Sequence, residues 1–285
     1  MTKCAFLGLG VMGYHMAGHL DVAVDELRVW IRSPEKRDAW GKTHRGIVSS
    51  SIQGAVAGAG YVVMCVGDDN DVYSVFDQVM EYIGPGSIII DHTTTSEKCA
   101  KYCYDTALKN SCGFIDAPIS GGETGAINGT LTAMCGGDEE VFSRSLAVIS
   151  HYCKSISLMG GSGSGQLTKM VNQICIAGLV QGLSEAINFG MKAGLNMEDV
   201  IEVISKGAAQ SWQMENRYKT MIDDKFDFGF AVDWMRKDLK IAMDEAKNNG
   251  SLLPVTELVD KYYGEVQGMG GNRWDTSSLI KRFRK

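Results

Sequence analysis

Short hydrophobic runs and helical patterns alternate along the first half of the chain. The runs predict strands over residues 3–7, 27–31, 47–48, 61–66, 87–91, 114–116, 131–135 and 154–158. Between them, apolar residues spaced three and four apart predict helices after residue 13 and over 51–59, 72–83 and 96–109. This alternation is typical of an α/β fold with a doubly wound parallel sheet, here with extra strands at its end.

The pattern changes after Gly165, where strand signals stop and helical periodicity takes over. Helices are predicted over residues 166–193, 197–205, 214–223, 231–248 and 254–267. We therefore expect an α/β domain over residues 1–163 and an all-α domain over residues 164–285. The glycine-rich run 160–165 lies at this border, where we expect it to loosen the chain.

The long predicted helix over residues 166–193 is apolar on more than one face. Its apolar residues are Ile174, Ile176, Leu179, Val180, Leu183, Ile187 and Phe189. A helix that is apolar all round has to be covered all round, and a small helical domain has little to cover it with. The pattern therefore predicts a partner subunit on this helix, in a homodimer or homotetramer.

Composition and charge narrow the function classes. The chain has 285 residues, 45% of them hydrophobic and 22% charged, with a net charge of −6 and a pI near 5.4. This acidic balance argues against nucleic acid and anionic membranes as partners. No uninterrupted apolar run reaches the length of a membrane span, and the first strand begins where a signal peptide would stand. We expect a cytoplasmic protein.

The eight cysteines are scattered, and several lie within hydrophobic runs, as Cys4, Cys65, Cys135 and Cys175 do. Without an export signal, reduced and buried thiols are the expectation. Two pairs lie one helical turn apart, Cys99 with Cys103 and His15 with His19. Neither pair has companions at ligand spacing, so we predict no metal site.

A glycine pattern follows the first strand directly: Gly8, Gly10 and Gly13 form GxGxxG within GLGVMG. A strand that turns through three spaced glycines into a helix is the fingerprint of dinucleotide binding in a Rossmann domain. The helix N-terminus then presents unpaired N–H groups to the pyrophosphate. The alternative is a glycine-rich turn that binds nothing.

The end of the second strand indicates which dinucleotide binds. An NAD enzyme usually has an acidic residue there, about 20 residues past the glycines, to bind the ribose hydroxyls. This chain has Arg32 and Ser33 instead. A guanidinium and a hydroxyl suit a 2′-phosphate, so we predict NADP, with NAD as the alternative. In the other interpretation Arg32 is a solvated loop charge, like Lys36 and Arg37 after it.

Two motifs near the domain border carry chemistry. The first, DAPISGG over residues 116–122, opens from a strand end into a glycine-rich loop that continues to Gly129. The Ser120 hydroxyl and the backbone N–H groups of Gly121 and Gly122 form a donor set for a carboxylate or an oxyanion. A flexible surface loop is the alternative.

The second motif begins the long helix, where Lys169 and Asn172 share one face. A lysine among apolar neighbours and beside a cationic nicotinamide has its charged form disfavoured, so it can act as acid or base near neutral pH. The alternative is an ordinary solvated lysine.

Together these motifs resemble the β-hydroxyacid dehydrogenase family, which includes 3-hydroxyisobutyrate dehydrogenases and glyoxylate or succinic semialdehyde reductases. The resemblance rests on GLGVMGYHM, DAPISGG, GSGSGQLTKMVNQ and Lys237-Asp238-Leu239, and it covers nearly the whole chain. It implies a Rossmann domain followed by a helical domain, usually in a dimer or tetramer.

The resemblance also implies roles for individual residues. Lys169 is then the catalytic acid/base, Asn172 holds the substrate, and Thr94 and Lys237 lie at substrate and nicotinamide. Ser120, Gly121 and Gly122 bind the substrate carboxylate. The expected cofactor residues are Gly8, Gly10, Val11, Met12, Gly13, Arg32, Ser33, Val66, Thr94 and Lys237.

The predicted reaction is reversible hydride transfer between NADP(H) and a small carboxylate-bearing substrate, such as a 3-hydroxyisobutyrate-like acid and its semialdehyde. Glyoxylate or succinic semialdehyde reduction is the alternative, and a non-catalytic dinucleotide-binding protein is a third reading. Family members usually have asparagine where this chain has Gln173, and serine where it has Thr93. Because Gln173 is one position round the helix from Asn172, it could point elsewhere, which leaves the substrate open.

Overall fold

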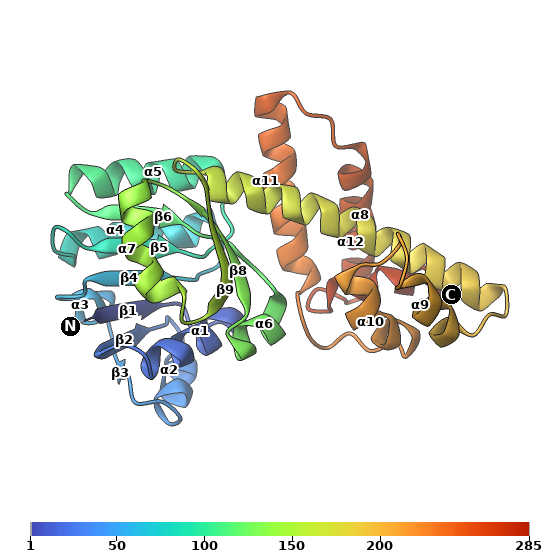
Figure 1. Ribbon diagram of the computed structural model, residues 1–285, viewed down its shortest axis with the longest axis horizontal. Helices are drawn as coiled ribbons and strands as arrows, with labels where there is room; N and C mark the ends of the chain where they lie inside the picture. The colour runs from blue at the N-terminus through green and yellow to red at the C-terminus, as the bar shows by residue number, and fades with distance from the viewer. Residues whose placement is uncertain (1, 285) are drawn as a thin grey trace. The chain divides into compact units, whose positions relative to one another are not determined.

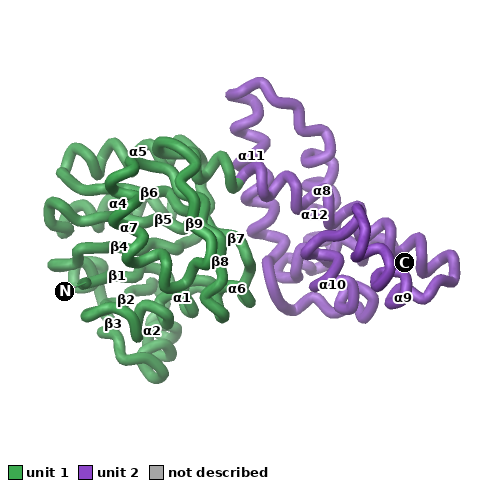
Figure 2. The backbone as a smooth tube through the Cα atoms, viewed as in Figure 1, with its two compact units in different colours: residues 1–169 green, residues 170–285 purple. Residues whose placement is uncertain are grey.

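The computed structural model describes residues 2–284, which form two compact units (Figure 2). Unit 1 ends at Lys169 and unit 2 begins at Met170. Unit 1 is built of strands and helices, whereas unit 2 is helical. The fold class predicted from the sequence is confirmed.

Unit 1 is organised around one sheet, whose strand order is β3-β2-β1-β4-β5-β6-β8-β7, with β9 paired to β8 (Figure 1). Pairing is parallel from β3 to β6, β8 runs antiparallel to β6 and β7, and β9 runs parallel to β8. The strands are β1 (Lys3–Leu7), β2 (Glu26–Trp30), β3 (Ile47–Val48), β4 (Tyr61–Met64), β5 (Ile88–Asp91), β6 (Gly113–Asp116), β7 (Ile119–Ser120), β8 (Leu131–Gly136) and β9 (Cys153–Gly160).

Helices cover both faces of this sheet. They are α1 (Val11–Asp21), α2 (Pro34–Gly41), α3 (Ile52–Val56), α4 (Asp69–Tyr82), α5 (Glu97–Lys109), α6 (Gly122–Asn128) and α7 (Glu139–Ile149). Side chains of α1, α2, α6 and α7 pack in one buried cluster with Phe6, and those of α3, α4 and α5 pack in a second with Leu7. Alternate residues of β1 thus enter opposite layers, as the period of a strand requires.

Three elements of unit 1 were not predicted as such. The segment after Asp116, expected to be a glycine-rich loop, contains the two-residue strand β7 and the helix α6. Gly121 and Gly122, with φ of 129° and 63°, make the turn between them. Both φ values lie in a region that residues with a side chain disfavour. The backbone conformation, rather than a flexible loop, therefore accounts for glycine at these positions. Helix α7 was also missed, although Val141, Ser145 and Val148 follow helical spacing.

The glycines at the border serve close packing, so the predicted loosening of the chain is wrong. A Cβ on Gly165 would lie 2.4 Å from the Met134 carbonyl oxygen and 2.7 Å from that of Asp116. Helix α8 already begins at Ser164, and Gly163 and Gly165 are both buried. Only glycine lets this part of the chain approach β6 and β8 so closely.

Unit 2 contains five helices and a 3-10 turn in the described residues. They are α8 (Ser164–Lys192), which starts in unit 1, α9 (Met197–Ile204), α10 (Trp212–Ile222), α11 (Val232–Asn249), α12 (Pro254–Gly268) and η1 (Thr276–Phe283). Helix α8 contributes Ala177 and Val180 to one buried cluster and Leu183 and Ile187 to another. Its length and hydropathy alone would also suit a membrane span, a test that core helices pass too. Side chains from part of α8 thus enter both clusters of unit 2.

Candidate active site

The turn after β1 is compressed in a way that requires glycine. Gly8 has φ 105°, and a Cβ there would lie 2.1 Å from the carbonyl oxygen of Cys65, which follows β4. A Cβ on Gly13 would lie 1.9 Å from the Gly8 carbonyl oxygen. The first and third glycines therefore serve the tight turn and the packing of helix on strand that the fingerprint implies.

The N-terminus of α1 is left without a side-chain cap. Its N-cap is Gly10, and its first turn, which includes Val11 and Met12, has no acidic residue. The other helices that follow β2 to β5 are capped by a hydroxyl or carboxylate, from Ser33, Ser51, Asp68 and Ser96. Within residues 2–284, therefore, no side chain caps the N–H groups at the start of α1, and these groups fit the pyrophosphate of a dinucleotide.

Arg32 and Ser33 follow β2, as predicted, and both already have partners. The Arg32 guanidinium, with 74% of its side chain exposed, forms an ion pair with Asp71 in the first turn of α4. The Ser33 hydroxyl donates to Glu35 at 2.8 Å and caps α2. A 2′-phosphate at this position would compete with Asp71 for the guanidinium, which is exposed enough to reach it.

The segments after β4 and β5 are fastened to each other. The Val66 N–H donates to the Thr93 hydroxyl at 3.0 Å, and the Thr93 N–H donates to the Asp91 carboxylate at 3.0 Å. Thr94, predicted at substrate and nicotinamide, is half-buried next to this pair. The structure therefore brings the predicted residues Gly8, Val66 and Thr94 to one edge of the sheet.

Sequence reasoning missed His92, which directly follows β5. Its Nδ1 lies 2.6 Å from the Ala117 carbonyl oxygen and its Nε2 lies 2.8 Å from the Tyr152 hydroxyl. A carbonyl only accepts, so Nδ1 carries the proton and the neutral ring accepts from Tyr152 through Nε2. Burial lowers the pKa of His92 to about 4. The imidazole ties the loop after β5 to the loop after β6.

Lys169 is buried, with 7% of its surface exposed, so it is not the solvated lysine of the alternative reading. Its Nζ donates to the Ile119 carbonyl oxygen at 2.9 Å. Ile119 immediately precedes Ser120, Gly121 and Gly122, the predicted carboxylate-binding residues. The structure therefore places the Lys169 ammonium next to the segment that is predicted to bind a substrate carboxylate. This is the position that the predicted acid/base requires.

Asp116, also missed as a site residue, fastens the beginning of α8. Its Oδ1 accepts from the Gly163 N–H at 2.8 Å and its Oδ2 accepts from the Gln166 N–H at 3.0 Å. The Gln166 side chain accepts from the Thr95 N–H and donates to the Thr93 carbonyl oxygen. Asp116 is fully buried, and burial raises its pKa to about 7.

In unit 2 the two predicted residues Asn172 and Lys237 are joined through a chain of polar contacts. The Asn172 amide donates to Gln173 Oε1 at 2.8 Å, and Gln173 Nε2 donates to Asp238 Oδ2 at 2.7 Å. Lys237 Nζ lies 3.1 Å from Asp238 Oδ1. Gln173 therefore does not point away from Asn172, as its position on the helix had suggested, but connects it to Asp238.

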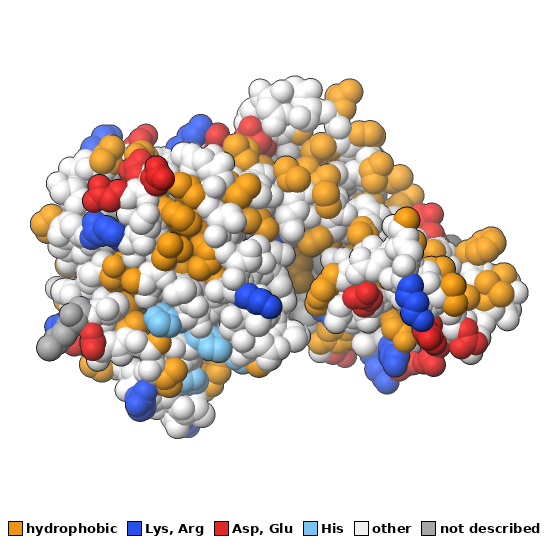
Figure 3. Space-filling model, viewed as in Figure 1, with side chains coloured by type: hydrophobic (Ala, Val, Ile, Leu, Met, Phe, Trp, Pro, Cys, Tyr) orange, Lys and Arg blue, Asp and Glu red, His pale blue; other side chains and the backbone are white. Residues whose placement is uncertain are grey.

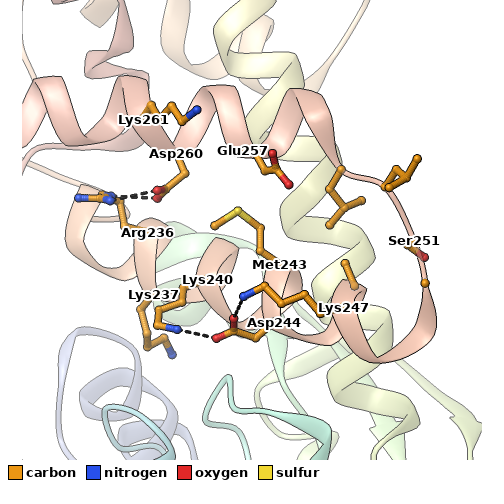
Figure 4. A pocket seen from close by; sticks show the side chains of 14 residues that line it. Arg236, Lys237, Lys240, Met243, Asp244, Lys247, Ser251, Glu257, Asp260 and Lys261 are labelled. Carbon is orange, nitrogen blue, oxygen red and sulfur yellow. Dashed lines mark hydrogen bonds and ion pairs between the residues drawn. The ribbon is translucent and has the colours of Figure 1, made fainter.

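A cavity of about 940 Å³ in unit 2 lies between α11 and α12, and Lys237 lines it (Figure 4). Several of its other charges are paired across or along the helices. Arg236 binds Asp260 of α12, and Asp244 accepts from both Lys240 and Lys247.

Two features define the class of protein. The glycine turn leads into α1 without a side-chain cap, and the buried Lys169 lies beside the segment of Ser120, Gly121 and Gly122. Together they define a dinucleotide-dependent dehydrogenase. Comparison with known proteins specifies the class. Residues 3–161 match the NAD binding domain of 6-phosphogluconate dehydrogenase, and residues 163–283 match the family described as NAD-binding of NADP-dependent 3-hydroxyisobutyrate dehydrogenase. The chain belongs to the β-hydroxyacid dehydrogenase family.

Individual relatives agree. The chain is 32% identical to 2-hydroxy-3-oxopropionate reductase of Escherichia coli, over 98% of this chain and 96% of the relative. It is 34% identical to a probable 3-hydroxyisobutyrate dehydrogenase-like protein of Arabidopsis thaliana, over 98% and 84%. The structure of Mycobacterium tuberculosis 3-hydroxyisobutyrate dehydrogenase with L-serine matches with a TM-score of 0.91 and 28% identity, over 100% of both chains. The protein is therefore an NAD(P)-dependent oxidoreductase of hydroxy acids, and the non-catalytic reading no longer applies.

Proposed function

We propose that the protein interconverts a small 3-hydroxy acid and its semialdehyde, with NADP(H) as cofactor and Lys169 as acid/base. The observation that carries this is the buried Lys169 ammonium, 2.9 Å from the carbonyl oxygen of Ile119, directly before Ser120, Gly121 and Gly122. Relatives named for 3-hydroxyisobutyrate and 2-hydroxy-3-oxopropionate support a substrate with a carboxylate and an oxygen two carbons away.

The residues divide the chemical work. When bound, the nicotinamide supplies or accepts the hydride. Ser120 and the N–H groups of Gly121 and Gly122 bind the carboxylate, which orients the reacting carbon. Lys169 gives a proton to the carbonyl oxygen in reduction and takes the hydroxyl proton in oxidation. Asn172, Thr94 and Lys237 hold the substrate and the cofactor beside it.

A substrate panel tests this function. Purified protein is assayed with NADP and short 3-hydroxy acids, and with NADPH against semialdehydes, glyoxylate and a neutral aldehyde of equal size. We expect the highest kcat/KM with a 3-hydroxyisobutyrate-like pair. A higher kcat/KM with glyoxylate or succinic semialdehyde establishes the alternative, a reductase of those acids. If none of the carboxylate-bearing compounds is turned over, the proposal is contradicted.

The cofactor assignment rests on Arg32 and Ser33. Replacing both with Ala should weaken NADPH binding by roughly 1.5 to 3 kcal/mol, the range for lost charged hydrogen bonds, and leave NADH nearly unchanged. The Asp71→Asn variant is the matched control, because it frees the guanidinium from its ion pair. It should tighten NADPH binding. Equal weakening of both cofactors by the double variant rules out a phosphate site here.

The exposed apolar residues of α8 support a homodimer or homotetramer. In the described chain Val171, Leu179, Phe189 and Met191 are 62, 38, 73 and 45% exposed. Hydrophobic side chains also crowd the visible face of unit 2 (Figure 3). A second copy that covers α8 would remove this apolar surface from water. We place the enzyme in the cytoplasm, to be tested by fractionation of cells that express it.

A further inference from the structure

Asp116 stands where the helix that carries Lys169 is attached to the sheet. Its two carboxylate oxygens accept from the N–H groups of Gly163 and Gln166, at 2.8 and 3.0 Å. These donors belong to the residue before α8 and to its first turn. Lys169 follows Gln166 by three residues, so the two share a helix face. The carboxylate therefore fixes the backbone from which the lysine side chain extends.

The same segment of sheet is bound to α8 a second time. Lys169 Nζ donates to the Ile119 carbonyl oxygen, three residues after Asp116. The helix is thus tied to the segment 116–119 at its backbone and at its reactive ammonium. Moving either attachment would shift Lys169 relative to Ser120, which follows Ile119.

Two glycines show how little freedom this attachment has. A Cβ on Gly136, the register partner of Asp116 on β8, would lie 2.7 Å from Asp116 Oδ1 and 2.8 Å from the Gly165 nitrogen. A Cβ on Gly165 would lie 2.7 Å from Asp116 Oδ2. The backbones of β8 and α8 both pack directly against the carboxylate, so the start of the helix fits closely at this point.

Two other titratable side chains lie near Asp116. Asp91 is its register partner on β5, and the pKa of the Cys135 thiol on β8 is raised mainly by burial and further by the Asp116 charge. Burial raises the pKa of Asp116 to about 7, and the Gly163 and Gln166 N–H groups oppose that rise by favouring the ionised form. An ionised carboxylate can accept both bonds equally, whereas a protonated one gives up one acceptor to its own O–H.

We propose that Asp116 is a positioning residue for catalysis: by holding the Gly163 and Gln166 N–H groups it sets the place of Lys169 against the segment that binds the substrate carboxylate. This rests on the proposed role of Lys169 as acid/base. Asp116 itself does not touch the reacting atoms. Its effect passes through Lys169.

The test is a double-mutant cycle with Asp116→Asn and Lys169→Ala. The Asn side chain has one acceptor in place of two and turns an NH2 group toward a backbone N–H donor. With Lys169 present, Asp116→Asn should lower kcat by about 10- to 100-fold, the effect of a displacement near 1 Å. The Kd for NADPH should change less than twofold. With Lys169→Ala, Asp116→Asn should cost less than a further twofold in kcat.

The outcomes separate this inference from the proposed function. If Lys169→Ala itself retains most of the turnover, the role of Lys169 fails. If Lys169→Ala strongly lowers kcat but Asp116→Asn lowers the remaining kcat by the same factor as it does with Lys169 present, the positioning role is overturned. It is also overturned if Asp116→Asn leaves kcat unchanged when Lys169 is present.

Asp275→Asn is the matched control, since Asp275 is also buried and accepts from two backbone N–H groups, those of Phe230 and Ser277. It should lower the melting temperature but change kcat less than twofold. If Asp275→Asn lowers kcat as much as Asp116→Asn does, then losing any buried carboxylate that binds backbone N–H groups lowers kcat. The position of Asp116 at the start of α8 would then not be the cause.

A measurement on the unmodified enzyme applies even where Asp116→Asn does not fold. Proton titration followed by NMR should move the amide signals of Gly163 and Gln166 and the Lys169 Cε signal with one midpoint, that of the Asp116 carboxyl. Amide signals that titrate while the Lys169 Cε signal does not follow them overturn the proposal, because the cap then does not act on the lysine.

Discussion

Replacing His92 with Gln should change how stability depends on pH. In the wild type the imidazole is fully buried, donates from Nδ1 to Ala117 and accepts from Tyr152 at Nε2. Protonating this imidazole would place a charge away from water, which costs free energy. The variant keeps a neutral polar side chain there but has nothing to protonate, so the difference between the two proteins isolates the titration of His92.

The size and direction follow from the pKa. Burial lowers the pKa of His92 from 6.5 to about 4, so the folded form stays neutral while the unfolded chain already binds a proton. The stability from the neutral ring is complete above pH 6.5 and is lost as the pH falls to 4. At about 1.4 kcal/mol per pH unit, the loss is about 3 kcal/mol. Asp116, whose pKa is raised from 3.8 to about 7, changes in the opposite direction, losing stability as pH rises through that range.

Because Asp116 acts the other way, the wild type alone would show a shallow profile, and the two proteins must be compared. Both proteins are equilibrated in urea at pH 7, 5.5 and 4, and a short deuterium pulse then labels the unfolded fraction. Deuterium uptake is measured on peptides of β5 and β6, because these report on unit 1. The advantage of the wild type over His92→Gln should shrink by about 3 kcal/mol between pH 7 and 4. An advantage that stays constant across this range contradicts the neutral, buried imidazole.

Three further outcomes are expected. Lys169→Ala should lower turnover by about 10²- to 10⁴-fold in steady-state assays while NADPH binding, measured by fluorescence, barely changes; retained turnover removes the acid/base role. Ser120→Ala should raise KM more for carboxylate-bearing substrates than for neutral aldehydes, and equal increases show that this segment does not bind the carboxylate. Sedimentation velocity at micromolar concentration should detect a dimer or larger assembly. A monomer would refute the proposal that a second copy covers α8.

The part of the fold that sequence predicts well is local. The run 3–7 and the three glycines after it predict β1, the turn and α1, because each feature depends on residues next to one another in the chain. The same holds for α8 to α12, whose periodicity extends over two turns or more. The short β7 and α6 escape such patterns, because the closely spaced Gly121, Gly122 and Gly125 indicate a loop when they are considered alone.

The contacts that organise the candidate site are of another kind. Arg32 meets Asp71 from 39 residues away, His92 meets Tyr152 from 60, and Asp116 meets Gly163 from 47. Each polar side chain could equally be solvated when judged from its neighbours in sequence. Only the order of strands in the sheet decides which loops meet and which charges pair.

The glycines at the border show why such contacts mislead a reading of the sequence. A run of glycines predicts freedom when each residue is considered alone. In the structure Gly165 is buried against Asp116 and Met134, and Gly136 against the same carboxylate. The absence of a side chain there lets two backbones touch, and the freedom that glycine has in the unfolded chain is lost on folding. The helix start that carries Lys169 is therefore packed closely against β6 and β8, as the acid/base role proposed for Lys169 requires.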